Sequence, residues 1–160
     1  MPPGLPESKL AFQVGCMVFN LLLKKMKDNV TQANVRIVKN FFAAFDSGDK
    51  QALLALSAEN VEWITPGEDW ALAGKRNGHA GLLDLIQTST EMLETSFPEP
   101  PEFVAQGDRV LVSGFSTGKV KATNKPFTDH FIIAITVRNG KVAKVREYLD
   151  TQALAQASKI

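Results

Sequence analysis

The C-terminal half of the chain is dominated by segments that are typical of neighbouring β-strands. From Pro126 to Thr151 the sequence PFTDHFIIAITVRNGKVAKVREYLDT contains two apolar runs separated by Asn139 and Gly140. An Asn-Gly pair between two such runs is a strong short-range signal for a β-hairpin. Upstream, EFVAQ and RVLVSGFSTGKV are also rich in β-branched and aromatic residues. The sequence therefore predicts a run of sheet-forming strands joined by short turns.

Helical patterns precede these strands. The segment from Thr31 onward repeats apolar residues at spacings of three and four, namely Val35, Val38, Phe41, Phe42 and Phe45. Gly48 predicts the end of this helix, and Asp49 predicts the N-cap of a short second one. A third helix is predicted through residues 82–93, before the proline-rich FPEPPE. Because helices come first and strands follow, the fold class is α+β, with helices covering one face of a largely antiparallel, curved sheet.

Composition bounds the classes of function. A chain of 160 residues with 44% hydrophobic and 22% charged residues is typical of one globular domain. The net charge of +1 gives no electrostatic footprint for nucleic acid, so we expect no such partner. Cys16 is the only cysteine, and the two histidines, His79 and His130, lie far apart in the sequence. We therefore expect no disulfide, no metal site and no cofactor, in a reducing, cytoplasmic environment.

Residues 1–28 form a separate N-terminal extension, which we expect to be helical or disordered. Its apolar run, from Leu10 to Leu23, is shorter than the roughly 20 residues that a membrane-spanning helix needs. The cluster of Lys24, Lys25 and Lys27 follows the run, whereas the basic cluster of a signal peptide precedes it. We expect no integral membrane segment. Three interpretations remain open: a helix packed on the domain, an extension upstream of a start at Met26, or a helix that docks on a membrane surface or a partner.

The order of these elements resembles that of a known family. The segments FFAAFDSGDKQALLALSAENVEW, ALAGKRNGHAGLLDL and ATNKPFTDHFIIAITVRNGKVAKVREYLDT are similar to SnoaL-like proteins of the nuclear transport factor 2-like superfamily. That superfamily includes ketosteroid isomerases, polyketide cyclases and limonene epoxide hydrolases. The resemblance covers residues 29–154 and leaves residues 155–160 as a C-terminal tail. It implies a cone-shaped half-barrel, in which the curved sheet packs on three N-terminal helices, encloses an apolar pocket and forms a homodimer.

The resemblance also allows two known chemistries to be tested. It places the catalytic base of a ketosteroid isomerase on Thr65, the tyrosine on Phe41, and the acidic donor near Ile132 or Ile133. None of these residues can perform the role. A pocket histidine common in SnoaL-like relatives also falls on Ile133. We therefore expect no steroid isomerase activity.

The epoxide hydrolases use an arginine flanked by two aspartates to activate water. The resemblance matches Arg109 to the arginine, but Leu111 stands where the first aspartate belongs, and Glu147 takes the place of the second. At most half of that triad is present. We therefore expect no epoxide hydration by the unmodified chain.

Alternation along the predicted strands separates the pocket face from the outer face. Asp129, Phe131 and Ile133 share one face, and His130 lies on the other. Because the resemblance places the family's pocket histidine at Ile133, it implies that the first face is the pocket face and that His130 points to the outer or dimer-facing side. Asp129 is either a solvated structural carboxylate at the strand start or a polar group at the pocket rim. His79 is predicted to lie in a surface loop or in the first turn of the third helix.

Glu147 is the strongest candidate for a functional side chain. It is the one ionisable group on a strand face that it shares with Val145 and Leu149. A carboxylate on an apolar face must be paired or must have a raised pKa. Two interpretations are open: a structural ion pair with Arg109, or a general acid, general base or ligand anchor.

Two hypotheses for function follow from these patterns. The first is a binding domain that holds an apolar or aromatic small molecule between the sheet and the helices. The second is a cyclase, isomerase or hydrolase in which Glu147, with Asp129 or Arg109, transfers a proton. Trp63 and Trp70 fit either the pocket wall or the core. The residues predicted to contact the ligand are Phe41, Trp63, Thr65, Trp70, Leu111, Phe131, Ile133 and Leu149.

Overall fold

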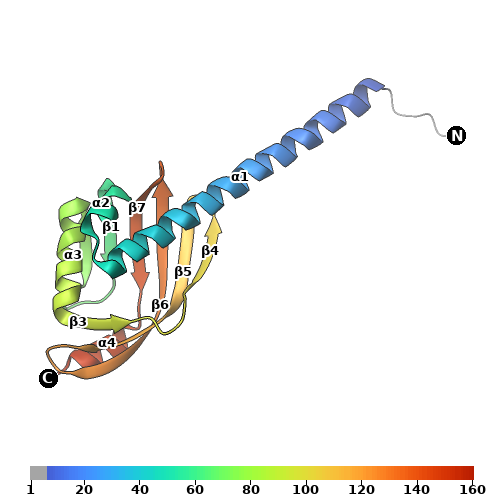
Figure 1. Cartoon of the computed structure of the whole chain (residues 1–160). Helices are drawn as coiled ribbons and strands as arrows, with labels where there is room; N and C mark the ends of the chain where they lie inside the picture. Colours follow the sequence, from blue (N-terminus) through green and yellow to red (C-terminus); the bar gives the residue numbers. More distant parts are fainter. Residues whose placement is uncertain (1–6) are drawn as a thin grey trace.

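A computed structural model describes the chain from residue 7 to residue 160 (Figure 1). The helices are α1 (Glu7–Ser47), α2 (Lys50–Ala55), α3 (Gly78–Met92) and α4 (Thr151–Ser158). The strands are β1 (Ser57–Thr65), β2 (Gly74–Asn77), β3 (Leu93–Ser96), β4 (Glu102–Gln106), β5 (Arg109–Val120), β6 (Lys125–Arg138) and β7 (Lys141–Tyr148). The predicted α+β class with a curved half-barrel sheet is confirmed.

All seven strands form one sheet. Its order is β2-β1-β7-β6-β5-β3, and β4 also pairs with β5. Every pair is antiparallel except the parallel pair of β1 and β7. Because β5 pairs with β4 along its first half and with β3 along its last four residues, the sheet curls around one side of the molecule (Figure 1).

The hairpin between β6 and β7 fixes the register of the site. Asn139 and Gly140 both have positive φ angles, of 51° and 72°, as a tight type I′ turn requires. The register shifts by one residue between Thr136 and Val137, and the antiparallel pairing beyond this shift places Ile133 directly opposite Glu147. These two side chains therefore lie on the same face of the sheet.

Helices α1, α2 and α3 cover the concave face of the sheet. Their most deeply buried side chains include Val38, Phe41, Leu53 and Leu82, each no more than 1% exposed. Gly48, with a φ angle of 70°, ends α1, and the Asp49 carboxylate caps α2 by accepting a hydrogen bond from the amide of Ala52 at 3.0 Å. The core thus lies between these three helices and the sheet, as the sequence predicts.

Two short strands and the last helix differ from the expectations. β2 and β3 have only four residues each, too few for a periodic pattern to be visible, and Leu93 begins β3 instead of ending the third helix. At the C-terminus, the Asp150 carboxylate caps α4 by accepting from the amide of Ala153 at 3.0 Å. α4 continues beyond residue 154, with Leu154 and Ala157 buried.

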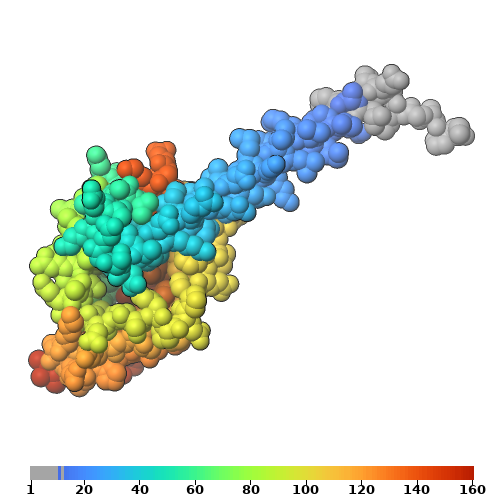
Figure 2. Space-filling model, viewed as in Figure 1, coloured from blue at the N-terminus to red at the C-terminus, as the bar shows by residue number. Residues whose placement is uncertain are grey.

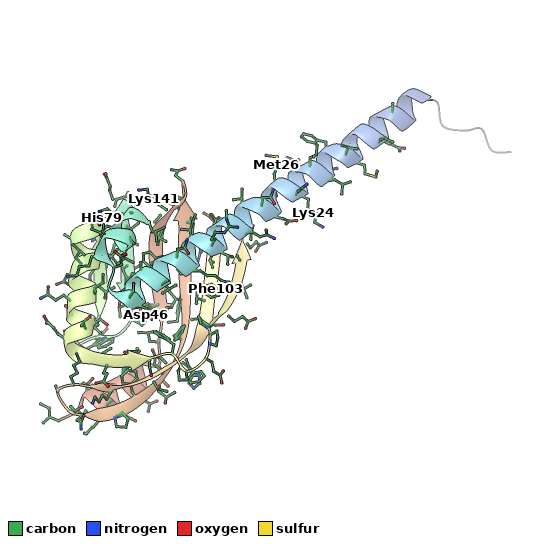
Figure 3. The ribbon with its side chains drawn as sticks, in the orientation of Figure 1. Lys24, Met26, Asp46, His79, Phe103 and Lys141 are labelled. Carbon is green, nitrogen blue, oxygen red and sulfur yellow. The ribbon has the colours of Figure 1, made fainter. Side chains whose placement is uncertain are left out.

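The N-terminal half of α1 does not pack on the domain. α1 leaves the sheet near Asn34, whose side-chain Nδ2 donates a hydrogen bond to the carbonyl of Gly107 at 2.9 Å. Before that point the helix extends into solvent, so that Lys24 and Met26 stand away from the domain (Figures 1 and 3). The interpretation of this segment as a helix packed on the domain is therefore wrong. Within residues 7–160, no helix combines the length and apolarity that crossing a bilayer requires.

Candidate functional site

A cavity of about 570 Å³ lies between the sheet and the helices. Aromatic side chains from several elements form much of its wall, among them Phe42, Phe45, Trp63, Trp70, Phe127 and Phe131. Figure 2 shows the corresponding hollow between α1 and the segment that contains β3. A cavity of this size and composition suits an apolar small molecule.

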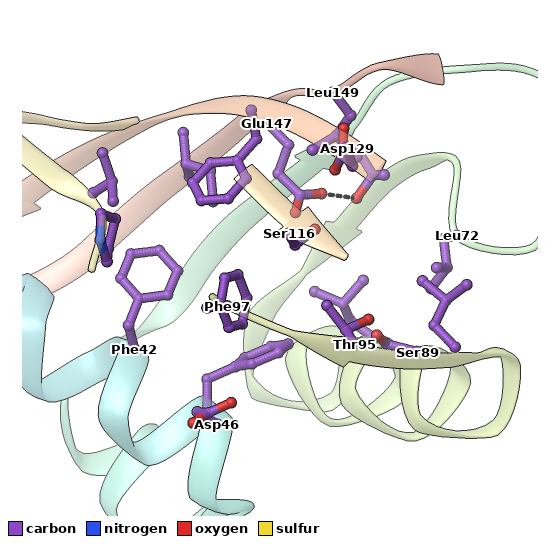
Figure 4. Close-up of a pocket in the computed structure, with 18 of the residues that line it drawn as sticks. Phe42, Asp46, Leu72, Ser89, Thr95, Phe97, Ser116, Asp129, Glu147 and Leu149 are labelled. Atoms are coloured by element: carbon purple, nitrogen blue, oxygen red, sulfur yellow. Dashed lines mark hydrogen bonds between the residues drawn. The ribbon is translucent and has the colours of Figure 1, made fainter. Parts of the chain in front are cut away.

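The opening of the cavity lies between α1 and the segment after α3. Lys39, Ala43 and Asp46 of α1 line the cavity and are exposed. Thr95 and Phe97 line it from the other side and are exposed as well. Figure 4 shows Asp46 at the bottom of the view and Glu147 near the top, with Phe97 between them. A ligand can therefore enter past polar groups and reach an aromatic interior.

Glu147 is the central polar group of this cavity. Trp63 donates a hydrogen bond from Nε1 to Glu147 Oε2 at 3.0 Å, and Thr65 donates from Oγ1 to the same oxygen at 2.6 Å. All three residues line the cavity. Both bonds end on Oε2, and among residues 7–160 no protein group forms a hydrogen bond with the other carboxyl oxygen, Oε1.

The pairing of β1 with its neighbours brings these donors to Glu147. Trp63 lies opposite Val145 in the parallel pair of β1 and β7, and Thr65 follows two residues later on the same face. On the other face of β1, Glu62 forms ion pairs with Lys75 of β2 and, at 2.8 Å, with Lys144 of β7. Hydrogen bonds from these two lysines lower the pKa of Glu62 to about 2. The ion pairs join three adjacent strands on their outer side.

The environment of Glu147 favours its neutral form. Desolvation is the largest influence and raises the pKa of Glu147 above its ordinary value of 4.5. The hydrogen bonds from Thr65 and Trp63 lower this pKa in part, and the negative charge of Asp129 raises it again. The side chain is only half-buried because it lines the cavity, so its carboxyl group is enclosed by protein and still open to a ligand.

Asp129 is a second carboxyl group at the cavity wall. It is 6% exposed, and its Oδ1 accepts a hydrogen bond from the amide of Asp150 at 2.6 Å. Burial raises the pKa of Asp129, while the bond from the Asp150 amide opposes this rise. Asp129 therefore holds the start of α4 and also lines the cavity. The interpretation of Asp129 as a solvated carboxylate at the strand start is wrong, because the residue is buried and β6 begins at Lys125.

The structure does not bring Arg109 or Leu111 to the cavity. Arg109 is exposed at the start of β5, opposite Thr136, whereas Glu147 lies opposite Ile133. Leu111 is 41% exposed on the outer face of β5. The reason is the alternation of β5, which turns Val110 and Val112 toward the core and their odd-numbered neighbours away from it. The predicted ion pair of Glu147 with Arg109 does not form.

The remaining predicted ligand contacts divide between the cavity and the core. Trp63, Thr65, Trp70, Phe131, Ile133 and Leu149 line the cavity. Phe41 instead lies in the core, fully buried, with its ring stacked on Trp63 at a centroid distance of 6.1 Å. His130 is exposed on the outer face of β6, and His79 lies in the first turn of α3, both within the predicted settings.

Sequence reasoning missed several side chains of the cavity. Ser116, 5% exposed and opposite Asp129 in the pairing of β5 with β6, belongs to the cavity wall. Alternation along β5 from Val112 would have placed it there. Phe42 and Phe45 carried the signal of an amphipathic helix but not of a cavity. Across residues 7–160, no group of three or more His, Cys, Asp or Glu side chains is placed to hold a metal ion.

Comparison with known proteins identifies the family. The SnoaL-like domain model matches residues 38–145, which include most of the cavity and Glu62, Trp63 and Thr65 of β1. The chain belongs to the SnoaL-like family. No curated protein matches this chain.

Solved structures agree with this SnoaL-like assignment. A nuclear transport factor 2-like protein from Burkholderia xenovorans LB400 is 62% identical, covers 81% of this chain and 98% of its own, and superposes with a TM-score of 0.78. TerC, co-crystallised with polyporic acid, is 27% identical over 78% of this chain and 97% of its own, with a TM-score of 0.70. A nuclear transport factor 2-like protein of unknown function from Burkholderia pseudomallei K96243 is 23% identical, over 80% and 98%, with a TM-score of 0.73, and shows the fold alone.

Proposed function

We propose that this SnoaL-like domain binds an apolar or aromatic small molecule and transfers a proton to or from it through Glu147. The observation that carries the proposal is the setting of the Glu147 carboxyl group. It lines an aromatic cavity, its two hydrogen-bond donors are the neutral groups of Trp63 and Thr65, and burial raises its pKa. A carboxyl group with a pKa moved toward neutrality is suited to act as general acid or base.

The geometry suggests different roles for the carboxyl groups of Glu147 and Asp129. Oε2 of Glu147 is held by Trp63 and Thr65, so Oε1 would face the ligand. In its neutral form Glu147 would donate a proton to a ligand oxygen, and in its charged form it would take one from an acidic carbon or hydroxyl group. Asp129 would remain bound to the Asp150 amide and would disfavour a second negative charge at the site.

A relative supports the small-molecule part of this proposal. TerC, which shares the fold and 27% of aligned residues, was co-crystallised with polyporic acid. The aromatic wall of the present cavity fits the same broad class of ligand, an organic molecule with an apolar body. A cyclase, an isomerase or a hydrolase is compatible with proton transfer at Glu147.

Binding without turnover is the second candidate function. It is favoured by the same hydrogen bonds, because a neutral Glu147 fixed by Trp63 and Thr65 would anchor a ligand oxygen with no further chemistry. The two candidates differ in one measurable respect. Only an enzyme would catalyse the exchange of a carbon-bound proton of the ligand with the solvent, or form a product.

Ligand binding is tested by narrowing the opening of the cavity. Ala43→Trp places an indole at the opening, and Asn40→Trp is the matched control, because Asn40 is exposed on the same helix and does not line the cavity. We expect Ala43→Trp to weaken binding of the apolar fluorophore 1-anilinonaphthalene-8-sulfonate by about tenfold or more, about 1.4 kcal/mol, with Asn40→Trp unchanged. Equal affinity in the two variants would contradict binding in this cavity.

Proton transfer is tested on whatever molecule co-purifies with the protein, as identified by native mass spectrometry. The compound is incubated in D₂O with the unmodified protein and with Glu147→Gln. Deuterium entering a carbon-bound position only with the unmodified protein supports the enzyme. Tight binding with no exchange and no product supports the binding function and rejects the catalytic one.

We further propose a homodimer formed through the outer face of the sheet. Leu111, Ile132 and Tyr148 leave between 41% and 53% of their surface exposed there, and Ile132 and Tyr148 are paired neighbours on β6 and β7. Ile132→Asp should shift the protein from dimer to monomer in sedimentation velocity. Gln87→Asp, an exposed position on α3, should leave the sedimentation unchanged. A monomeric unmodified protein would overturn this assembly.

A further inference from the structure

The N-terminal half of α1 exposes large apolar side chains on most of its circumference. Val14, Met17, Val18, Phe19, Leu21 and Leu22 each leave between 47% and 61% of their surface accessible. No described residue of the domain covers them, since α1 leaves the sheet near Asn34. Isolated exposed apolar residues are ordinary, but a contiguous helical segment of this kind marks an interaction site.

Most polar side chains of the same segment form one narrow stripe, and Lys25 is the exception, because it follows Val18 by seven residues and lies on the opposite face. Gln13, Asn20, Lys24 and Lys27 follow one another at spacings of seven, four and three residues, which places them on a single helix face. Val18 and Leu22 lie on the opposite face. The segment is therefore an amphipathic helix with a wide apolar face and a narrow polar one.

Charge separates this segment from the rest of the chain. Residues 8–27 contain four lysines and neither aspartate nor glutamate. Because the net charge of the whole chain is +1, the remaining residues together carry −3. The basic charge also gathers at one place, with Lys24, Lys25 and Lys27 at the end of the apolar run nearer the domain.

We propose that residues 11–27 of α1 bind the surface of an anionic lipid bilayer. The apolar face would enter the boundary between headgroups and acyl chains, to a depth of about 5–10 Å, and the lysines would contact anionic headgroups. The apolar run of 14 residues spans about 21 Å as a helix, shorter than a hydrocarbon core of about 30 Å. The helix thus lies in the interface and does not cross it.

A second copy of the chain is a less complete partner for this helix. Cys16, Phe19, Leu23, Met26 and Val30 follow a heptad spacing of three and four, as a two-stranded coiled coil requires. Such a pairing buries one seam and leaves Val18 and Leu22 in water. A bilayer covers both the seam and these residues, and it also accounts for the lysines.

The test uses the full chain and sedimentation with lipid vesicles. We expect binding to vesicles of phosphatidylcholine mixed equally with phosphatidylserine, and much weaker binding to phosphatidylcholine alone. Each lysine near an anionic surface contributes about a fivefold gain in affinity, so the triple variant Lys24→Glu, Lys25→Glu, Lys27→Glu should bind about a hundredfold more weakly or worse. The matched control reverses three exposed lysines of the domain, Lys50→Glu, Lys141→Glu and Lys159→Glu, and should retain most of the affinity.

A second pair of variants separates the bilayer from a second copy. Val18→Asp with Leu22→Asp disrupts the face opposite the polar stripe, and Phe19→Asp with Leu23→Asp disrupts the heptad seam. Loss of vesicle binding in the Val18 and Leu22 variant, with helix content retained in circular dichroism, supports the proposal. It is overturned if the unmodified chain does not bind anionic vesicles. It is also overturned if the helix self-associates without lipid and only the Phe19 and Leu23 variant prevents this.

Discussion

Glu147→Gln is expected to abolish proton transfer while the folded domain becomes at least as stable at neutral pH. The amide oxygen of glutamine can still accept the hydrogen bonds of Trp63 and Thr65, so the cavity wall is retained. Glutamine cannot carry or release the proton, and losing a general acid or base lowers the rate by about 10²–10⁴-fold. The same substitution removes a carboxylate whose charged form is disfavoured by burial.

The pH dependence of the unfolding free energy explains why Glu147→Gln should not destabilise the domain at neutral pH. Desolvation raises the pKa of folded Glu147 above the ordinary 4.5 of the unfolded chain. The folded state therefore binds the proton more tightly, and the stability from this residue is fully present below pH 4.5 and is lost as the pH rises through the folded pKa. For each unit by which the pKa is raised, the loss is about 1.4 kcal/mol.

Denaturant unfolding at several pH values measures this difference. The unfolding free energy of Glu147→Gln should lack the part of the decline above pH 4.5 that comes from Glu147. The variant should therefore become more stable relative to the unmodified protein as the pH rises, until the difference in unfolding free energy levels off. The titration of the Glu147 carboxyl group by NMR checks the pKa directly. A lowered pKa, with a variant less stable by several kcal/mol, would mean that Glu147 is a structural carboxylate and not a general acid.

Gly118→Ala should be the most destabilising single-methyl change at the cavity rim. A Cβ atom on Gly118 would lie 1.9 Å from the carbonyl oxygen of Glu94 and 2.9 Å from Phe127 Cζ. The first contact is with backbone, which can give way only if β3 moves away from β5. We expect a loss of about 3 kcal/mol in unfolding free energy, at the upper end of the usual cost of overpacking.

Gly118→Ala should also disturb the ligand site. β3 carries Thr95 opposite Gly118, and Thr95 with Phe97 forms one side of the cavity opening. Gly118→Ala should therefore lower the thermal midpoint in circular dichroism and weaken fluorophore binding. Gly15→Ala is the control, because a Cβ there meets nothing within 4 Å and alanine favours a helix. Equal midpoints for the two variants would show that β3 is held less tightly than its geometry implies.

Local periodicity was sufficient for the faces within one strand. Successive strand residues alternate sides, so Asp129, Phe131 and Ile133 could be assigned together. The position of Glu147 relative to them also needed the one-residue register shift between Thr136 and Val137, because the turn at Asn139 and Gly140 alone would place Arg146 opposite Ile133. Capping by Asp49 was equally predictable, because a cap depends on residues three positions apart. Alternation and capping both involve residues only a few positions apart, so they can be recognised from a short stretch of sequence.

The partners of Glu147 required the tertiary structure. Trp63 and Thr65 lie 84 and 82 residues away in sequence and reach it through the parallel pairing of β1 with β7. Arg109 was the predicted partner because a carboxylate is expected to pair with a positive charge. The register and alternation of β5 instead turn Arg109 to the outer face of the sheet. Which non-adjacent strands meet depends on the whole sheet, so residue type alone favoured the wrong pair.

The sequence by itself determined the α+β class, the resemblance to the family, the alternation of side chains within each strand and the Asp49 cap of α2. The tertiary structure decided that Glu147 faces a cavity with neutral donors, that Phe41 lies in the core, and that α1 continues far beyond the sheet. The reason is physical: helix and strand periods are local properties of the chain, whereas burial and desolvation depend on what other segments supply. For residues 11–30 of α1 the domain supplies no covering surface, and the side chains described there remain exposed.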